Sequence, residues 1–122
     1  MTEHSAGNLT AFNATRNAVV ATKVEKADTA AARNIGLLGR ESLAPEEGLW
    51  IAPCPMIHTF FMKFPIDVLF LDSALCVARV IEDLRPWRLS PWVLSARSVL
   101  ELKGGILKGS VHVGDRLEMR PS

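Results

Sequence analysis

Apolar residues in this chain occur in short runs divided by turn residues, a pattern typical of a β-rich fold. The longest apolar stretch, 54–72, also contains His58, Lys63 and Asp67, which are polar side chains at positions where burial is expected. We predict seven strand segments, with a bend at Pro65 between the third and the fourth: 18–25, 49–51, 59–64, 66–71, 76–84, 98–102 and the end of 113–119.

One helix is predicted at 28–39, where Asp28 is a suitable N-cap, Ile35 and Leu38 share one face, and a glycine ends the element. The glycine-rich segment 104–109 is predicted to form one short helical turn.

Turn residues at 72–75 separate two predicted strands and favour a tight antiparallel hairpin. We therefore expect a mainly β fold of the α+β class: an antiparallel β-sandwich or a partly open barrel, with one helix and a short helical turn. Residues 1–17 are small and polar and are predicted to form a flexible N-terminal arm, which leaves 18–122 as a single β-rich domain.

The composition is that of an ordinary folded domain. Of the 122 residues, 48% are hydrophobic and 22% are charged, which is enough apolar material for a core without metal or disulfide support. The formal net charge of +1 gives no excess of Lys and Arg. Nucleic acid and an anionic membrane surface are therefore not expected as partners.

Two cysteines, Cys54 and Cys76, are too few for a disulfide framework and are expected to be reduced. The N-terminus shows no secretory signal, and we expect a cytoplasmic protein. The apolar stretch 49–71 is not expected to span a membrane, because it contains prolines together with Lys63 and Asp67. Each such charge costs about 2.5–3.5 kcal/mol at a membrane centre.

Four segments, in this order, resemble the family catalogued as domain of unknown function 192: GLLGRESL at 36–43, FMKFPIDVLFLD at 61–72, VLEL at 99–102 with a glycine soon after, and VGD at 113–115. That family has a Gly-Leu-Met helix end followed by Gly-Arg, and then a Trp-Met-Lys-Asn segment leading to an Ile-Pro-Leu-Asp-Ile strand. A Val-Leu-Glu-Leu strand and a closing Gly-Asp follow. The resemblance covers about 20–119, which is nearly the whole predicted domain.

The resemblance implies a compact, mostly β fold with few helices and no established activity. The chain departs from the family pattern at two places. Phe61 stands where the family usually has Trp, and Phe64-Pro65 replaces the longer approach that contains Asn. We therefore expect no site here that depends on that Asn.

Lys63 and Asp67 flank the bend at Pro65 inside an apolar stretch. One interpretation is a buried ion pair that fixes the bend, which would favour one fold without adding net stability. The other is an ammonium and a carboxylate that face a ligand at the mouth of a pocket. The sequence leaves both open.

Cys54 and His58 are weak candidates for catalysis, because a neighbouring imidazole lowers the pKa of a thiol. The same two residues are also conceivable zinc ligands, completed by Cys76, Asp67 or His112. No close pair of ligands of the kind typical of zinc sites is present, and we predict no metal. The simpler interpretation is a small apolar cysteine and a hydrogen-bonded histidine at the core boundary.

Trp87, Arg88 and Trp92 lie on a loop fixed by Pro86 and Pro91. Tryptophan and arginine are enriched at binding hot spots, and a loop held by prolines loses little entropy on binding. The alternative is a cap over one end of the fold, with half-buried indoles and solvated guanidinium groups.

No catalytic or cofactor motif of known mechanism occurs, so no cofactor is predicted, and enzymatic activity is not the favoured interpretation. We expect a small ligand-binding module for a small polar molecule, a sugar or a peptide, with Lys63, Asp67, Trp87, Arg88 and Trp92 as ligand-binding residues. The alternatives are a cysteine-dependent hydrolase that uses Cys54 and His58, and a protein-interaction or accessory domain without catalysis. The oligomeric state is not predicted.

Overall fold

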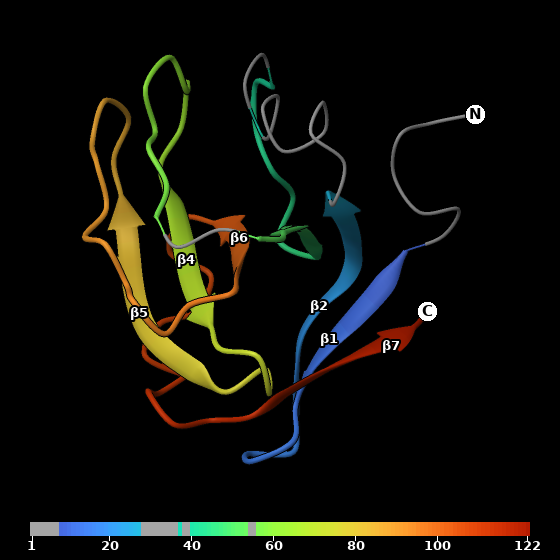
Figure 1. The fold of residues 1–122 in the computed structure, drawn as a ribbon. Helices are drawn as coiled ribbons and strands as arrows, with labels where there is room; N and C mark the ends of the chain where they lie inside the picture. The colour runs from blue at the N-terminus through green and yellow to red at the C-terminus, as the bar shows by residue number, and fades with distance from the viewer. Residues whose placement is uncertain (1–7, 28–36, 38–39, 54–55) are drawn as a thin grey trace.

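The computed structural model describes residues 8–27, 37, 40–53 and 56–122, which form an all-β domain (Figure 1). Its seven strands are β1 (Leu9–Asn13), β2 (Ala18–Ala27), β3 (Glu47–Ile51), β4 (Ile66–Leu71), β5 (Val77–Leu84), β6 (Ser98–Lys103) and β7 (Leu117–Pro121). The described residues contain no helix, and thus none long and apolar enough to cross a membrane.

All seven strands belong to one sheet in the order β5-β4-β6-β3-β2-β1-β7. The sheet is mixed, because β2 and β3 run parallel while every other neighbouring pair is antiparallel. It curls into a half-barrel (Figure 1), and its two outer strands approach each other at one end, where Cys76 forms a bridge with Arg116. The β-rich class is therefore confirmed, whereas the two-sheet sandwich and the purely antiparallel arrangement are wrong.

Most predicted strands are confirmed because each has a continuous apolar run or an apolar face to bury. The strand predicted at 59–64 is wrong: the Met62 amide donates to the Thr59 carbonyl at 3.2 Å, and Phe61 between them has a φ of 66°, so a tight turn replaces the strand. The helical turn predicted at 104–109 is also wrong, because positive φ values at Gly105 and Gly109 interrupt any helical run.

Two further predictions concern the N-terminal part of the chain. The predicted helix at 28–39 lies outside the described residues, apart from Leu37. The strand β1 was not predicted: Leu9–Asn13 falls within the range assigned to a flexible arm, yet it pairs with both β2 and β7. The sheet therefore begins nine residues before the predicted domain boundary at Ala18.

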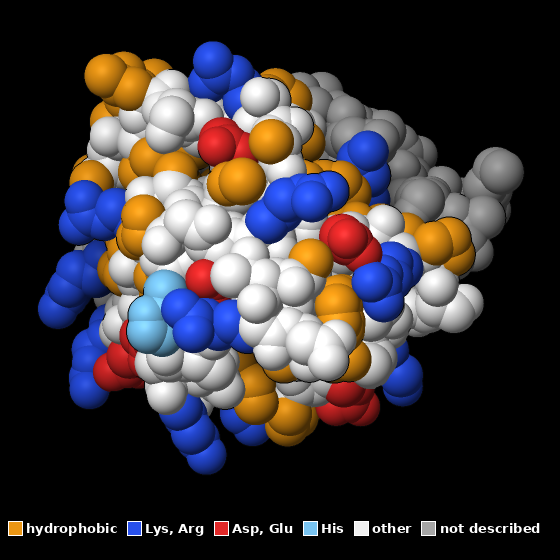
Figure 2. Space-filling model, turned by 90° about the horizontal axis from the view of Figure 1, so that it is seen from below, with side chains coloured by type: hydrophobic (Ala, Val, Ile, Leu, Met, Phe, Trp, Pro, Cys, Tyr) orange, Lys and Arg blue, Asp and Glu red, His pale blue; other side chains and the backbone are white. Residues whose placement is uncertain are grey.

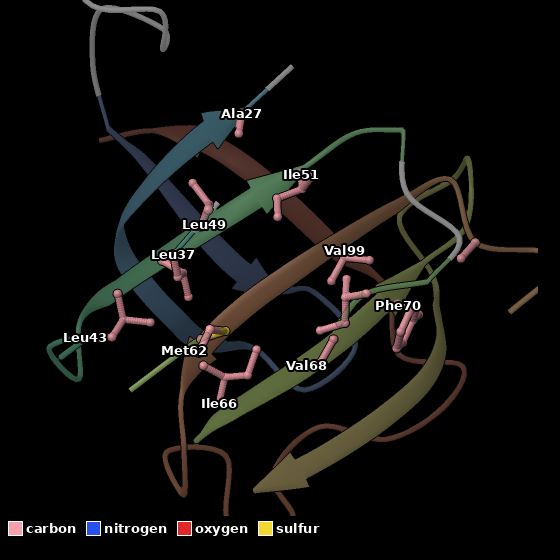
Figure 3. Close-up of a cluster of buried hydrophobic side chains, with 12 residues drawn as sticks. Ala27, Leu37, Leu43, Leu49, Ile51, Met62, Ile66, Val68, Phe70 and Val99 are labelled. Atoms are coloured by element: carbon pink, nitrogen blue, oxygen red, sulfur yellow. The ribbon is translucent and has the colours of Figure 1, made fainter. Parts of the chain in front are cut away.

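Apolar side chains are buried on both faces of the sheet. The cluster on one face, here called the Phe70 cluster, is joined by Leu37, Leu43 and Met62 from the connecting segments (Figure 3). The cluster on the other face, the Leu100 cluster, lies inside the curl and is closed by side chains of the 104–113 loop: Leu107 and Val111. Because both faces are covered, β4 is buried along its whole length.

The end of the sheet at which β5 approaches β7 is held by Asp115. Its carboxylate accepts hydrogen bonds from the Asn13 amide group (3.0 Å), the Arg16 guanidinium (2.8 Å) and the backbone N–H of His112 (2.9 Å). Burial raises the pKa of Asp115, but these donors outweigh it and hold the pKa at about 2.

Seen from below in Figure 2, the molecule shows basic, acidic and apolar side chains interspersed.

Candidate functional site

Lys63 and Asp67, the two charged residues that flank the Pro65 bend, have separate partners. Asp67 is fully buried in β4 at 0% exposure, and its carboxylate accepts hydrogen bonds from three backbone N–H groups: those of Asp83 (2.8 Å), Gly105 (2.9 Å) and Leu107 (2.9 Å). These bonds join β4 to the end of β5 and to the loop after β6. Asp67 therefore holds the backbone of these three segments together.

Lys63 has a different environment. Its side chain is 54% exposed and forms an ion pair with Glu41, and no contact with Asp67 is present. Of the two interpretations that the sequence leaves open, the buried Lys63–Asp67 ion pair is therefore wrong. The turn at 59–62 rotates Lys63 outward, while β4 carries Asp67 into the core.

Two loops form the most distinctive surface of the domain. Residues 56–64 and 85–97, called here the loop pair, stand side by side beyond β4 and β5 (Figure 1). Three backbone hydrogen bonds of 2.9 Å join them: Thr59 N–H to the Arg88 carbonyl, Trp87 N–H to the Thr59 carbonyl, and Ser90 N–H to the Ile57 carbonyl. The loops form one paired unit.

Side chains reinforce this pairing from inside. The Thr59 hydroxyl is buried between the loops, where it donates to the Arg85 carbonyl at 2.5 Å and accepts from the Arg88 N–H at 2.9 Å. Nearby in the loop pair, the Ser90 hydroxyl accepts a hydrogen bond from the Ile57 N–H at 2.9 Å. Buried polar groups with such partners fix a conformation, because each lost bond leaves a buried donor or acceptor unpaired.

Four aromatic rings lie together on the outside of the loop pair. The rings of His58 and Phe60 stack at a centroid distance of 5.0 Å, Phe60 stacks with Trp87 at 6.1 Å, and Phe61 contacts Trp87 at 4.6 Å. We call these four residues the aromatic platform. The rings of Phe61 and Trp87 remain open to solvent, at 69% and 56% exposed, whereas Phe60 is half-buried.

The 85–97 loop extends this apolar surface and adds positive charge. Leu89, Trp92 and Leu94 are all exposed. The guanidinium of Arg88 bonds only to the carbonyl oxygens of Pro86 and Trp87, so it has no carboxylate partner among the described residues. Of the predicted ligand-binding residues, Trp87, Arg88 and Trp92 thus belong to the 85–97 loop. Lys63 belongs to the other loop of the pair but is paired with Glu41, and Asp67 is buried in β4.

We expect Thr59→Val to loosen the loop pair. Valine has nearly the shape of threonine, so the change removes the two hydroxyl hydrogen bonds to Arg85 and Arg88 without leaving a cavity. The expected loss is about 1–3 kcal/mol of unfolding free energy, with faster amide exchange at Arg88. Urea denaturation and hydrogen exchange measure both. Thr22→Val, on an exposed position of β2, is the control and should change neither.

Of the two candidates for catalysis, only His58 lies among the described residues. Cys54 lies outside the described residues. His58 is exposed, and its Nδ1 accepts a hydrogen bond from the Phe60 N–H at 3.2 Å, so it belongs to the aromatic platform. Within the part of the chain that the structure describes, no three His, Cys, Asp or Glu side chains are grouped as metal ligands.

Glu101 is a candidate that the sequence reasoning did not single out. It lies in the centre of β6, between Leu49 of β3 and Val68 of β4, and is only 4% exposed. Burial raises the pKa of its carboxyl group from 4.5 to about 8. The signal in the sequence was one acidic residue inside the otherwise apolar run Val99–Leu102.

The fold and the loop pair define a small all-β domain with a mixed, curled sheet and an aromatic surface at one end. The chain belongs to an uncharacterised family, domain of unknown function 192, described as "Uncharacterized ACR", whose model matches residues 11–119. The resemblance found in the sequence is thereby confirmed.

Two archaeal relatives carry the same family designation, UPF0127. A protein of Pyrococcus furiosus is 34% identical over 114 residues, which cover 88% of this chain and 95% of that protein. A protein of Pyrococcus abyssi is 46% identical over 63 residues, which cover 51% of this chain and 53% of that protein; this chain therefore matches about half the length of that relative.

Two bacterial crystal structures have a similar fold. One, described as a putative transcription regulator from Sinorhizobium meliloti, has a TM-score of 0.78 and 26% identity over 98% of this chain and 97% of that chain. The other, a protein of unknown function from Novosphingobium aromaticivorans, has a TM-score of 0.76 and 24% identity over 90% of this chain and 82% of that chain.

Proposed function

We propose that this domain is a binding module whose loop pair takes an extended peptide segment that carries apolar and acidic side chains. The observation behind the proposal is the aromatic platform: rings in mutual contact and exposed to solvent, beside Arg88, which has no acidic partner among the described residues. Apolar side chains gathered at an exposed surface are characteristic of interaction sites.

The chemistry of the loop surface favours a peptide over a sugar or a small polar molecule. Leu89 and Leu94 extend the apolar surface beyond the rings, and isolated leucines suit aliphatic side chains better than hydroxyl groups. Arg88 and Arg97 bond only to backbone carbonyls among the described residues, so their guanidinium groups are available to carboxylates. The occupant that complements both is a peptide with apolar and acidic residues.

The pairing of the loops supports binding because loops that are already ordered lose little conformational entropy when a ligand binds. A loop that must order itself on binding loses affinity, whereas a loop already held by hydrogen bonds does not. Thr59 and Ser90 supply those bonds here. Although the Sinorhizobium protein is described as a putative transcription regulator, the proposal for this chain includes no contact with DNA, because its net charge is only +1.

A peptide library displayed on phage and selected on the purified domain tests this function. We expect selected sequences to be enriched in Leu or aromatic residues next to Asp or Glu. A synthetic peptide of the enriched sequence should bind Trp87→Ala at least tenfold more weakly, because hot-spot tryptophans contribute about 2 kcal/mol or more. Isothermal titration calorimetry gives the two dissociation constants.

Val113→Ala is the matched control, since Val113 is also an exposed apolar residue on a loop but lies outside the loop pair. It should bind the peptide as the unaltered protein does. Failure to enrich any sequence over an unrelated β-domain would overturn the proposal, and so would equal loss of affinity in both variants. A sugar that binds at the platform on a glycan array, with no enriched peptide, would also count against it.

A further inference from the structure

The loop pair contains a short antiparallel ribbon with His58 and Leu89 at its centre. These two residues form an isolated bridge, which lies between the two 2.9 Å hydrogen bonds that the Thr59 and Ser90 N–H groups donate to the opposite loop. Residues that face each other between such bonds direct their own backbone N–H and C=O groups away from the partner strand. His58 and Leu89 therefore each present an N–H and a C=O group at an outer edge of the ribbon.

The backbone groups at both edges are unpaired within the part of the chain that the structure describes. No backbone or side-chain group hydrogen-bonds to the N–H or C=O group of Leu89, and the same holds for those of His58. Backbone groups without a partner are rarely buried, and Leu89 is 57% exposed, so its edge faces water. An open strand edge of this kind can pair with a further strand.

The two edges differ in charge. The Leu89 edge belongs to the loop 85–97, which has three arginines and no acidic residue. The His58 edge belongs to the other loop, whose one lysine, Lys63, is paired with Glu41. An acidic segment is therefore attracted to the Leu89 edge. A second copy of this chain is repelled, because pairing two Leu89 edges would bring together two loops that each carry three arginines.

Leu89 and Arg88 point to opposite faces of the ribbon, because side chains alternate along an extended strand. Leu89 shares its face with His58, whose ring stacks on Phe60 in the aromatic platform. Arg88 is exposed and has no carboxylate partner among the described residues. A strand added beside Leu89 would place one side chain next to this leucine and direct the residues before and after it to the face of Arg88.

We propose that the peptide bound by the loop pair is recognised as a third, antiparallel strand beside Leu89. This inference rests on the peptide binding proposed above. Leu89 and one apolar peptide residue exchange two backbone hydrogen bonds, from N–H to C=O in each direction. The partner is thus an extended segment in which an apolar residue with a free backbone N–H has acidic neighbours. Proline is excluded at the central position because it has no N–H.

Hydrogen exchange of the unaltered protein, followed by NMR, is the first test, and the probe is the synthetic peptide of the sequence enriched by phage display. With saturating peptide, the Leu89 N–H should exchange about tenfold or more slowly than in the free protein, whereas exchange of the His58 N–H should not change. Protection of the His58 N–H instead, or of neither, would overturn the proposal. Protection of Leu89 in the free protein that grows with protein concentration would also overturn it, because a second copy would then occupy the edge.

The second test replaces the backbone N–H groups of the same peptide by N-methyl groups, one at a time. Methylation of the residue opposite Leu89 removes a donor and should raise the Kd about tenfold or more. The N–H groups of its two neighbours point away from the ribbon, so their methylation is the matched control and should change the Kd less than about threefold. Isothermal titration calorimetry measures each Kd.

The results separate this inference from the function on which it rests. If every methylated peptide binds like the parent peptide while Trp87→Ala still weakens binding of the parent, strand addition at Leu89 is wrong and peptide binding by the loop pair stands. If phage display enriches no sequence, or Trp87→Ala binds the parent peptide normally, both proposals are wrong.

Discussion

The unaltered protein is expected to lose unfolding free energy as the pH rises from about 4.5 to about 8, and Glu101→Gln is expected to remove this pH dependence. The pKa of Glu101 is about 8 in the folded protein, against 4.5 for an ordinary glutamate, so the folded state holds a proton that the unfolded state releases. Stability from this group is fully present below pH 4.5 and is lost as the pH rises through 8.

The expected size of the effect follows from the shift in pKa. Each unit is worth about 1.4 kcal/mol, so the free energy of unfolding should fall by roughly 4–5 kcal/mol across the window. Urea denaturation at a series of pH values measures it. The difference between Glu101→Gln and the unaltered protein isolates Glu101, and Asp115 does not interfere because its pKa of about 2 lies below the window. Parallel pH profiles for the two proteins would contradict the prediction.

Asp67→Asn is expected to cost about 3 kcal/mol or more of unfolding free energy at neutral pH, although asparagine has almost the same shape. The carboxylate accepts one N–H each from Asp83 and Gly105 at Oδ1 and one from Leu107 at Oδ2. An asparagine side chain has a single oxygen, and its NH₂ group would face a backbone donor. At least one buried N–H then loses its acceptor, and the remaining bonds lose the help of the charge.

Thermal unfolding of Asp67→Asn, together with hydrogen exchange at Gly105 and Leu107, checks this result. Asp83→Asn is the control: Asp83 is exposed, its ion pair with Arg85 spans 3.5 Å, and its φ of 55° is one that asparagine adopts readily. It should change stability by less than about 0.5 kcal/mol. A cost for Asp67→Asn as small as that of the control would show that the three hydrogen bonds do not stabilise the fold.

The central strands could be predicted because their residues determine them locally. Ile66–Leu71 and Ser98–Lys103 are mainly apolar segments, too short for helices and bounded by turn residues, and both are buried in the sheet except for Lys103. The hairpin from β4 to β5 could also be predicted from the sequence, because an aspartate such as Asp72 often closes a turn; here it accepts hydrogen bonds from the Ala74 and Cys76 amides.

Features that depend on distant parts of the chain could not be predicted. The parallel pairing of β2 with β3 depends on the route of the connection between them, on which local patterns carry no information. β1 is five residues long and owes its stability to β2 and β7 on either side. Its sequence, LTAFN, has no marked strand signal of its own.

The candidate site shows the same division. The Trp87–Trp92 loop was recognisable from its prolines, tryptophans and arginines, and it does carry an exposed surface. Its partner rings Phe60 and Phe61 were assigned to a strand, because a left-handed residue in a turn is not visible in an apolar run. The sequence does not reveal Glu101, because an acid in a strand is usually solvated, and only the burial of both faces of the sheet excludes that here.

The pairing of β1 with β7 has a practical consequence for handling this domain. The Ser122 N–H donates to the Asn8 carbonyl at 3.2 Å, and the Ser122 hydroxyl donates to the Thr22 carbonyl at 2.9 Å, so positions 8 and 122 are neighbours in space. In Figure 1 they lie on the side of the molecule away from the loop pair. A label or a surface attached at either position would therefore be remote from the loop pair and would leave the aromatic platform accessible. Joined at both, the domain would fit into a surface loop of a host without forcing the ends of that loop apart.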